Sequence, residues 1–220
     1  TMPLDLPLPI IYPITSGTTT AETTPDDPQF VSILRLVQAA VDAEVPLLQI
    51  REKALPARVL YELTTRAGEI TRGSKTRLLV NDRSDIARAA GADGVHLTTH
   101  SLPADVVRRI YGPEFLIGVS THSLEAARDA AKAGADFVVF GPVFETESKR
   151  VYGAPQGLEK LRDVTTELRE FPVVAIGGIT LDNVESGFAA GASGVAAIRL
   201  LSDVASMELT VEKIRNEFQR

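Results

Sequence analysis

Two kinds of segment alternate along the chain when hydrophobic and polar positions are compared. Eight short runs are rich in apolar and β-branched residues, a pattern typical of strands buried on both faces of a parallel sheet. The predicted strands are Ile10–Thr15, Leu47–Arg51, Arg77–Asn81, Gly94–Thr98, Phe115–Ser120, Phe137–Val143, Phe171–Gly177 and Gly194–Arg199.

Amphipathic segments separate these runs. Apolar residues recur every three or four positions in 30–44, 101–112 and 123–135, which predicts helices, and a last such segment spans 207–219. Ser101 and Ser123 are the expected N-caps of two of them. Three predicted strands follow an Ala-Gly-Ala tripeptide, whose glycine can end a helix and turn the chain into the next strand.

Eight strand–helix units in 220 residues favour a closed (β/α)8 TIM barrel that forms one domain over residues 1–220. A doubly wound open sheet is the alternative, but its GxGxxG motif is missing. In a TIM barrel the carboxyl ends of the strands carry the chemistry. The segment 15–29, rich in Thr, Pro and Asp, is therefore expected to be a loop beside the site.

Composition narrows the function classes. The chain contains no cysteine, which excludes disulfides, thiolate catalysis and cysteine-bound metal. Its net charge of −6 opposes contact with a phosphate backbone, so we expect no nucleic-acid partner. No apolar run approaches the ~20 residues of a membrane span, and the first residues lack the features of a signal peptide. We therefore expect a cytoplasmic protein that does not contact a membrane.

The second and third predicted strands end in polar side chains. Period-two alternation puts Gln49, Arg51 and Lys53 on one face, an arrangement that suits a phosphorylated ligand or, alternatively, a solvated surface. The third strand ends at Asn81 and Asp82. The carboxylate of Asp82 could hold Mg²⁺ or cap the next helix.

Two later strand ends are candidate phosphate sites. Gly177 and Gly178 follow the seventh strand, where backbone N–H groups can approach a phosphate, although a tight turn alone would also explain them. After the sixth strand, Thr146, Ser148 and Lys149 could clamp a phosphate or pyrophosphate, or form an exposed polar loop.

The histidines do not predict a metal site. His96 and His100 on one extended strand would lie roughly 13 Å apart, too far to bind the same ion. His122 follows the fifth strand. Its imidazole could exchange a proton with a substrate near neutral pH, or it could cap the helix that starts near Ser123.

Several motifs, taken in order, resemble one known family over nearly the whole chain. They are IYPIT, LLQIREK, LLVNDRSDIARAAGADGVHL, IGVSTHSLEAARDAAKAGADFVVFGPVFETESK, APQGLEKL and PVVAIGGI. The chain resembles the thiamin phosphate synthase/TenI family, which also contains the thiazole tautomerases. The resemblance implies a barrel that holds a phosphorylated thiazole near the loops after strands seven and eight. It also implies a homo-oligomer, with a dimer as the expected state.

In the synthases of this family, Mg²⁺ and cationic residues hold the departing pyrophosphate of a pyrimidine diphosphate, and the thiazole nitrogen captures the resulting cation. The residues of this chain that match that set are Gln49, Arg51, Lys53, Asn81, Asp82, Ser120, Lys149 and Gly178. The resemblance implies catalytic roles for His122, Lys53 and Lys149. It implies substrate or phosphate binding for Gln49, Arg51, Asn81, Ser120, Thr146, Ser148, Gly177, Gly178 and Arg199, and Mg²⁺ binding for Asp82.

The chain also departs from the family pattern. Residues 98–101 read Thr-Thr-His-Ser, where the synthases usually have Gly-Gln-Glu-Asp with a Mg²⁺-binding final carboxylate. Arg199 stands in place of a usual phosphate-binding serine, Ser148 in place of a threonine, and Ser16 where an aspartate is frequent.

The missing carboxylate weakens the case for metal chemistry, because neither serine nor imidazole replaces an anionic oxygen ligand of Mg²⁺ well. The sequence therefore favours a metal-independent thiazole tautomerase that needs no cofactor and moves a proton with His122. The first alternative is a Mg²⁺-dependent thiamin phosphate synthase. The second is a barrel without catalytic activity that binds thiazole phosphate or thiamin phosphate.

Overall fold

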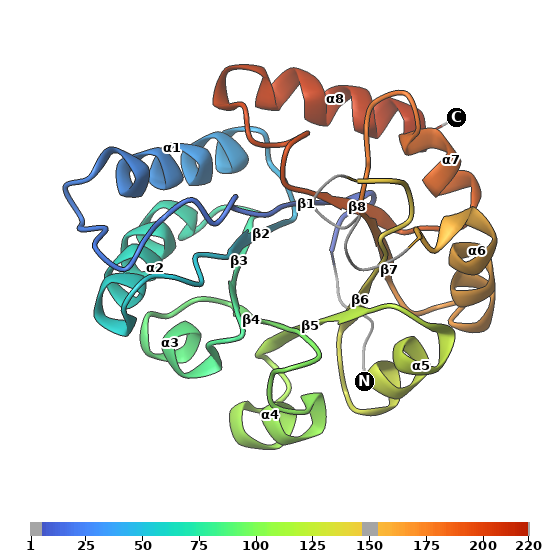
Figure 1. Ribbon diagram of the computed structural model, residues 1–220, viewed down its shortest axis with the longest axis horizontal. Coiled ribbons are helices and arrows are strands. Elements are labelled where there is room, and N and C mark those ends of the chain that lie inside the picture. Colours follow the sequence, from blue (N-terminus) through green and yellow to red (C-terminus); the bar gives the residue numbers. More distant parts are fainter. Residues whose placement is uncertain (1–5, 147–153, 220) are drawn as a thin grey trace.

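The computed structural model describes residues 6–146 and 154–219, and it shows a parallel barrel surrounded by helices (Figure 1). This confirms the predicted TIM barrel. The strands are β1 (Ile10–Pro13), β2 (Leu47–Ile50), β3 (Arg77–Asn81), β4 (Gly94–Leu97), β5 (Leu116–Thr121), β6 (Phe137–Phe140), β7 (Val173–Ile176) and β8 (Gly194–Ala197).

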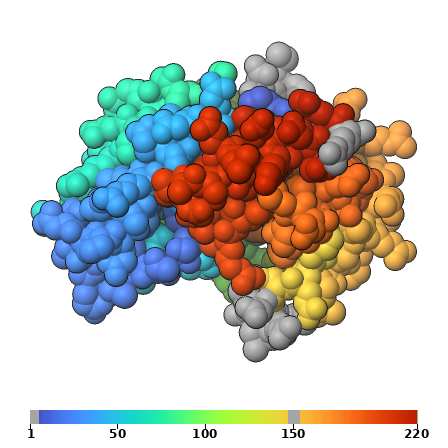
Figure 2. All heavy atoms as spheres, turned by 90° about the horizontal axis from the view of Figure 1, so that it is seen from above, coloured from blue at the N-terminus to red at the C-terminus, as the bar shows by residue number. Residues whose placement is uncertain are grey.

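Helices follow the strands around the outside. They are α1 (Pro28–Asp42), α2 (Ala57–Thr71), α3 (Ser84–Ala89), α4 (Ala104–Tyr111), α5 (Leu124–Lys132), α6 (Gly157–Glu167), α7 (Val184–Ala189), the short η2 (Val204–Ser206) and α8 (Met207–Phe218). Figure 2 shows α8 beside α1, and Arg215 Nη2 donates to the carbonyls of Ala43 and Glu44 at 3.2 and 2.9 Å. This contact joins the last helix to the end of the first. Within the described residues, no helix is both long and apolar enough to cross a bilayer.

The sheet closes between β1 and β2. The strand order runs β1-β8-β7-β6-β5-β4-β3-β2, so β1 and β2 are its two ends. Ile14 pairs with Gln49 in a parallel bridge, and Thr15 N donates to the Gln49 carbonyl at 3.0 Å. Closure explains why all the strand carboxyl ends meet in one place.

The barrel has two apolar layers because alternate residues of each strand face opposite sides. Residues that face the helices, such as Ile11, Leu48 and Val138, form the outer layer with the helix side chains. The interior layer is Ile10, Tyr12, Ile14, Leu47, Leu79, Phe137, Val139, Val174 and Ala196. The barrel interior is therefore packed with side chains and is not an open channel.

The repeated Ala-Gly-Ala segments serve the opposite end of the barrel. Asp93, which follows the first repeat, accepts a hydrogen bond from Leu78 N at 2.8 Å, and Asp136, which follows the second, accepts one from Ile117 N at 2.7 Å. Arg108 binds the Asp136 carboxylate at 2.6 Å. These contacts hold the amino ends of neighbouring strands together. The repeats therefore stabilise the barrel at the end opposite the candidate site.

One predicted N-cap is confirmed and one is wrong. Ser123 Oγ accepts from Ala126 N at 3.1 Å and caps α5. Ser101 does not cap α4, which begins at Ala104 after Pro103. Its hydroxyl instead accepts from Thr98 N at 2.8 Å, which closes a turn before the helix.

Candidate active site

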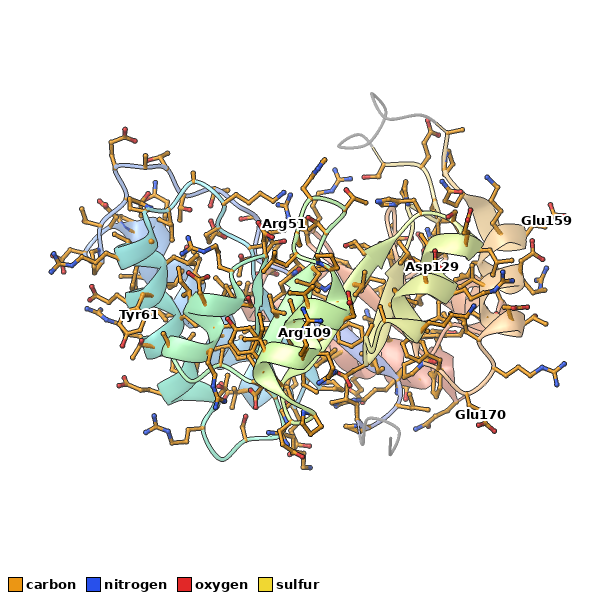
Figure 3. The ribbon with its side chains drawn as sticks, turned by 90° about the horizontal axis from the view of Figure 1, so that it is seen from below. Arg51, Tyr61, Arg109, Asp129, Glu159 and Glu170 are labelled. Carbon is orange, nitrogen blue, oxygen red and sulfur yellow. The ribbon has the colours of Figure 1, made fainter. Side chains whose placement is uncertain are left out.

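We define the rim as the carboxyl ends of the eight strands and the segments that directly follow them. Figure 3 labels Arg51, just after β2, and Glu170, before the amino end of β7, and the two lie toward opposite edges of the molecule. Figure 2 shows a hollow at the rim between the loop after β1 and the segment after β8. The predicted residues that the rim brings together are Gln49, Arg51, Asn81, Asp82, Ser120, His122, Thr146, Gly177, Gly178 and Arg199.

At the carboxyl end of β2 lie a buried amide, Gln49, and a partly buried guanidinium, Arg51. Gln49 is 1% exposed, and its Nε2 is buried without a hydrogen-bond partner among the described residues. The positive charge of Arg51 contributes, after burial, to lowering the pKa of His96 inside the barrel. A buried amide donor without a partner costs free energy in the empty protein, so a ligand acceptor would stabilise it.

The predicted alternation does not extend to Lys53. β2 ends at Ile50, and Lys53 lies exposed in a turn that the hydrogen bond from Leu55 N to the Glu52 carbonyl closes. The strand ends early because Glu52 points to the loop after β1. The backbone of Lys53 therefore lies at the outer part of the rim. Its long, flexible side chain can carry the ammonium group some distance from that backbone position.

Glu52 also shapes the site, although no motif in the sequence singles it out. Its carboxylate is 2% exposed and accepts from Gly17 N at 3.0 Å, Thr19 N at 3.2 Å and Thr19 Oγ1 at 2.7 Å. These bonds hold the loop after β1 beside Arg51, since a Cβ on Gly17 would lie 3.3 Å from Arg51 Nη1. Nothing in the sequence spacing shows that residues 33 or 35 positions apart meet here.

At β3, Asn81 is buried and Asp82 is exposed. Asp82 has a φ of 64°, in the left-handed region, and its N–H donates to the His96 carbonyl at 2.8 Å. A left-handed conformation is unfavourable for a residue with a side chain, and such strain is concentrated at functional sites. Arg83, and not Asp82, occupies the N-cap position of α3. The capping alternative for Asp82 is therefore not supported.

Asp82 is the carboxylate of β3 that remains available to a ligand. Its neighbour Asp85 binds Arg83 at 2.6 Å, and this ion pair lowers the pKa of Asp85. The described residues contain no group of three or more His, Cys, Asp or Glu side chains that could hold a metal ion. Any Mg²⁺ at this rim would therefore have fewer than three such protein ligands among the described residues.

A line of three polar side chains leads from the interior to the rim. Tyr12 Oη lies 3.3 Å from His96 Nδ1, and His96 Nε2 lies 2.8 Å from Ser120 Oγ. Burial, with a smaller effect of the Arg51 charge, lowers the pKa of His96 to about 3. His96 is therefore neutral at physiological pH. The sequence predicts no metal site at His96, and its spacing does not reveal this connection between three strands.

His122 lies exposed above β5 and β6. Its Nδ1 is within hydrogen-bond distance of the Gly141 carbonyl. A carbonyl only accepts hydrogen bonds, so Nδ1 carries a proton and, in the neutral ring, Nε2 is left as a basic atom. The capping alternative is wrong, because Ser123 caps α5.

The loops after β6, β7 and β8 pack against one another. Gly177 and Gly178 have φ values of 97° and 66°, and Cβ atoms there would lie 2.5 Å from Pro142 Cα and 2.5 Å from the Glu145 carbonyl oxygen. Packing alone therefore requires both glycines. Arg199 Nη2 donates to Thr146 Oγ1 at 3.3 Å, which joins the segment after β8 to the loop after β6. Ser148 and Lys149, also predicted for this loop, lie outside the described residues.

Sequence and structure comparisons with known proteins match this chain to thiamine-phosphate synthases and to a thiamine phosphate pyrophosphorylase. A thiamine-phosphate synthase from Moorella thermoacetica is 41% identical over 187 residues, covering 85% of this chain and 89% of the relative. One from Methanoculleus marisnigri is 45% identical over 163 residues, covering 74% and 77%. A solved thiamine phosphate pyrophosphorylase from Pyrococcus furiosus matches with a TM-score of 0.76 and 31% identity, covering 95% of each chain.

The names of these relatives favour the synthase over the tautomerase that the sequence alone favours. The family model described as thiamine monophosphate synthase matches residues 20–201, a span that contains nearly all of the rim. By this match and by the relatives, the chain belongs to the thiamine monophosphate synthase family.

Proposed function

We propose that this protein is a thiamine-phosphate synthase, which joins a phosphorylated thiazole to an aminohydroxymethylpyrimidine diphosphate and releases pyrophosphate. The observation that carries the proposal is the position of Asp82, an available carboxylate held at the rim in a left-handed conformation. Arg51 stands at the end of the neighbouring strand. A carboxylate for a metal and a cation for phosphate on adjacent strands suit a metal-bound diphosphate.

The proposed reaction breaks the bond between the pyrimidine methylene carbon and the diphosphate oxygen. The bonding electrons leave with pyrophosphate, and the thiazole nitrogen then gives its lone pair to the methylene carbon. Cations near the leaving group stabilise the charge that develops on its oxygens. Arg51 and Lys53 are the described residues that we assign to this task.

The rim offers Mg²⁺ one carboxylate ligand, Asp82, among the residues that we assign to the site. Mg²⁺ commonly keeps several waters and binds one or two carboxylates together with substrate phosphates, so Asp82 alone can serve as its protein ligand. When bound, the ion would neutralise part of the charge on the diphosphate. Ser101, which stands where a second carboxylate is usual in the family, leaves the diphosphate itself as the main partner of the ion.

We assign the thiazole phosphate to the segments after β6, β7 and β8. Gly178 lies beside the loop that contains Thr146, and Arg199 donates to Thr146 from the other side. A guanidinium can give two parallel hydrogen bonds to a phosphate, whereas a serine hydroxyl gives one. Arg199 would therefore bind the phosphate with more charge than the serine it replaces.

The experiment that tests the proposal compares Asp82→Asn with the control Asp85→Asn. Pyrophosphate release from the two substrates is measured over a range of Mg²⁺ concentrations. We expect Asp82→Asn to lower kcat roughly 10²-fold or more, the usual loss when one charge-stabilising group is removed. Asp85→Asn should change it little, because Asp85 is paired with Arg83. Equal activity of the two variants would refute the role of Asp82.

His122 supports a second candidate, the thiazole tautomerase. Its Nδ1 is held by the Gly141 carbonyl, so Nε2 can accept a proton from a thiazole carboxylate phosphate. If this activity exists, it should survive EDTA. His122→Ala should then lower it roughly 10²–10⁴-fold, the usual contribution of a positioned base. The matched control is His100→Ala, which removes a second exposed imidazole of the same end of the barrel.

A further inference from the structure

The buried tyrosine at the centre of the barrel has one described hydrogen-bond partner. Tyr12 is 0% exposed, and its hydroxyl lies 3.3 Å from His96 Nδ1. Phe137 packs edge-on against its ring, with centroids 5.7 Å apart. Burial raises the pKa of Tyr12 well above its usual value, so the phenol keeps its proton. Tyr12 therefore lies too deep to touch a substrate and can act only through His96.

The direction of the two hydrogen bonds follows from counting protons. The Tyr12 hydroxyl has one proton, and among the described residues its one acceptor is His96 Nδ1. If Nδ1 carried the proton instead, the buried phenol would be left without an acceptor, which costs free energy. Nδ1 therefore accepts, and the proton of the neutral imidazole is on Nε2.

The same logic fixes the hydroxyl of Ser120. Nε2 donates to Ser120 Oγ at 2.8 Å, so this oxygen acts as an acceptor toward the interior. The serine proton then points elsewhere, and Ser120 is only partly buried at the end of β5. The reverse arrangement, with Ser120 donating to Nε2, would require the tautomer that the buried phenol disfavours.

We propose that Tyr12 and His96 are positioning residues that set the direction of the Ser120 hydroxyl, so that Ser120 donates its proton to a lone-pair acceptor of the bound substrate, such as a ring nitrogen. This inference rests on the proposed function for the identity of the substrate, but the proton arrangement itself does not. The interior of the barrel thereby contributes to recognition at the rim through two hydrogen bonds.

The arrangement of protons is tested without any substrate. In the full chain labelled with ¹⁵N, long-range proton–nitrogen spectra report which imidazole nitrogen of His96 carries the proton, and His96→Gln identifies its signals. We expect the Nε2–H tautomer. An Nδ1–H tautomer would overturn the inference, and this result does not depend on whether the protein is a synthase.

The functional consequence is tested by a double-mutant cycle of Tyr12→Phe and Ser120→Ala. Tyr12→Phe removes only the hydroxyl, and it should lower kcat/KM for thiamine phosphate formation about three- to tenfold, the effect of one hydrogen bond. In the Ser120→Ala background the same substitution should have no further effect, because its route to the substrate is gone. The matched control Tyr61→Phe removes a hydroxyl on the outer surface of α2, labelled in Figure 3, and should have no effect in either background.

A purely structural role of Tyr12 gives a different result. Loss of packing or stability would lower kcat/KM by the same factor in both backgrounds, and that outcome would overturn the inference. If no variant and no wild-type protein makes thiamine phosphate, the proposed function fails. The tautomer measurement then still decides the direction of the Tyr12–His96–Ser120 bonds.

Discussion

Thr19 Oγ1 donates to Glu52 Oε2 at 2.7 Å, although the two residues are 33 positions apart in the chain. Both side chains are buried, and the same carboxylate also accepts from the backbone of Gly17 and Thr19. The contact joins the loop after β1 to the end of β2 beside Arg51. Three hydrogen-bond donors, Gly17 N, Thr19 N and Thr19 Oγ1, contact the carboxylate.

Glu52→Gln should destabilise this loop. An amide offers one acceptor oxygen, and its NH₂ group would face donors that the carboxylate now satisfies, so we expect a loss of about 1–3 kcal/mol in the free energy of unfolding. Urea denaturation measures this loss. The matched control is Glu22→Gln, in the same loop but exposed, which should leave the midpoint unchanged. Equal midpoints for the two variants would show that the carboxylate does not hold the loop.

Charge reversal at Arg199 should weaken phosphate binding. We expect Arg199→Glu to reduce the affinity for thiazole phosphate roughly 10- to 100-fold, whereas Arg199→Ser keeps a hydroxyl donor and should lose less. Isothermal titration calorimetry measures both. Arg169→Glu, a reversal near the amino end of β7, is the control and should bind normally. An unchanged affinity in Arg199→Glu would place the phosphate elsewhere.

A carboxylate introduced at Ser101 should strengthen the metal dependence. Ser101 lies in the turn after β4, next to the strand that carries Asp82. Ser101→Asp should lower the Mg²⁺ concentration for half-maximal turnover at least about fivefold, because it adds an anionic ligand. Ser101→Asn has nearly the same shape without the charge and should not. If both variants behave alike, the effect is not electrostatic.

Gly178 and Gly157 provide a matched test of packing at the rim. Both have positive φ, but a Cβ on Gly178 would meet the Glu145 carbonyl oxygen at 2.5 Å, whereas one on Gly157 would meet no atom of the described residues within 4 Å. Gly157→Ala should cost about 1–2 kcal/mol for its conformation alone. Gly178→Ala should cost about 2–5 kcal/mol, since overpacking adds to this. Thermal or urea unfolding compares them, and equal losses would mean that the loop moves away freely.

The periodicity of the chain was enough to predict the barrel, because continuous apolar strands and amphipathic helices bury different faces. It also placed Gln49, Asn81 and Gly178 at the correct end. It could not show the early end of β2, since the carboxylate of Glu52 turns toward a loop that is distant in sequence.

Contacts across strands were likewise hidden from the sequence. Alternation puts Tyr12, His96 and Ser120 on the inner side of three separate strands, but their hydrogen bonds depend on the register between strands, which closure determines. Taken from the sequence alone, the missing carboxylate at Ser101 favours a tautomerase. The names of the relatives favour the synthase instead, and substrate phosphates can supply oxygen ligands to Mg²⁺ as well.

The most direct test of the central claim is the turnover of the wild-type protein with both proposed substrates. With Mg²⁺ present, we predict thiamine phosphate and pyrophosphate in equal amounts, at a rate on the order of 1 s⁻¹ or more, and loss of this activity in EDTA. The account would be contradicted if no thiamine phosphate forms while thiazole carboxylate phosphate is isomerised at such a rate in EDTA.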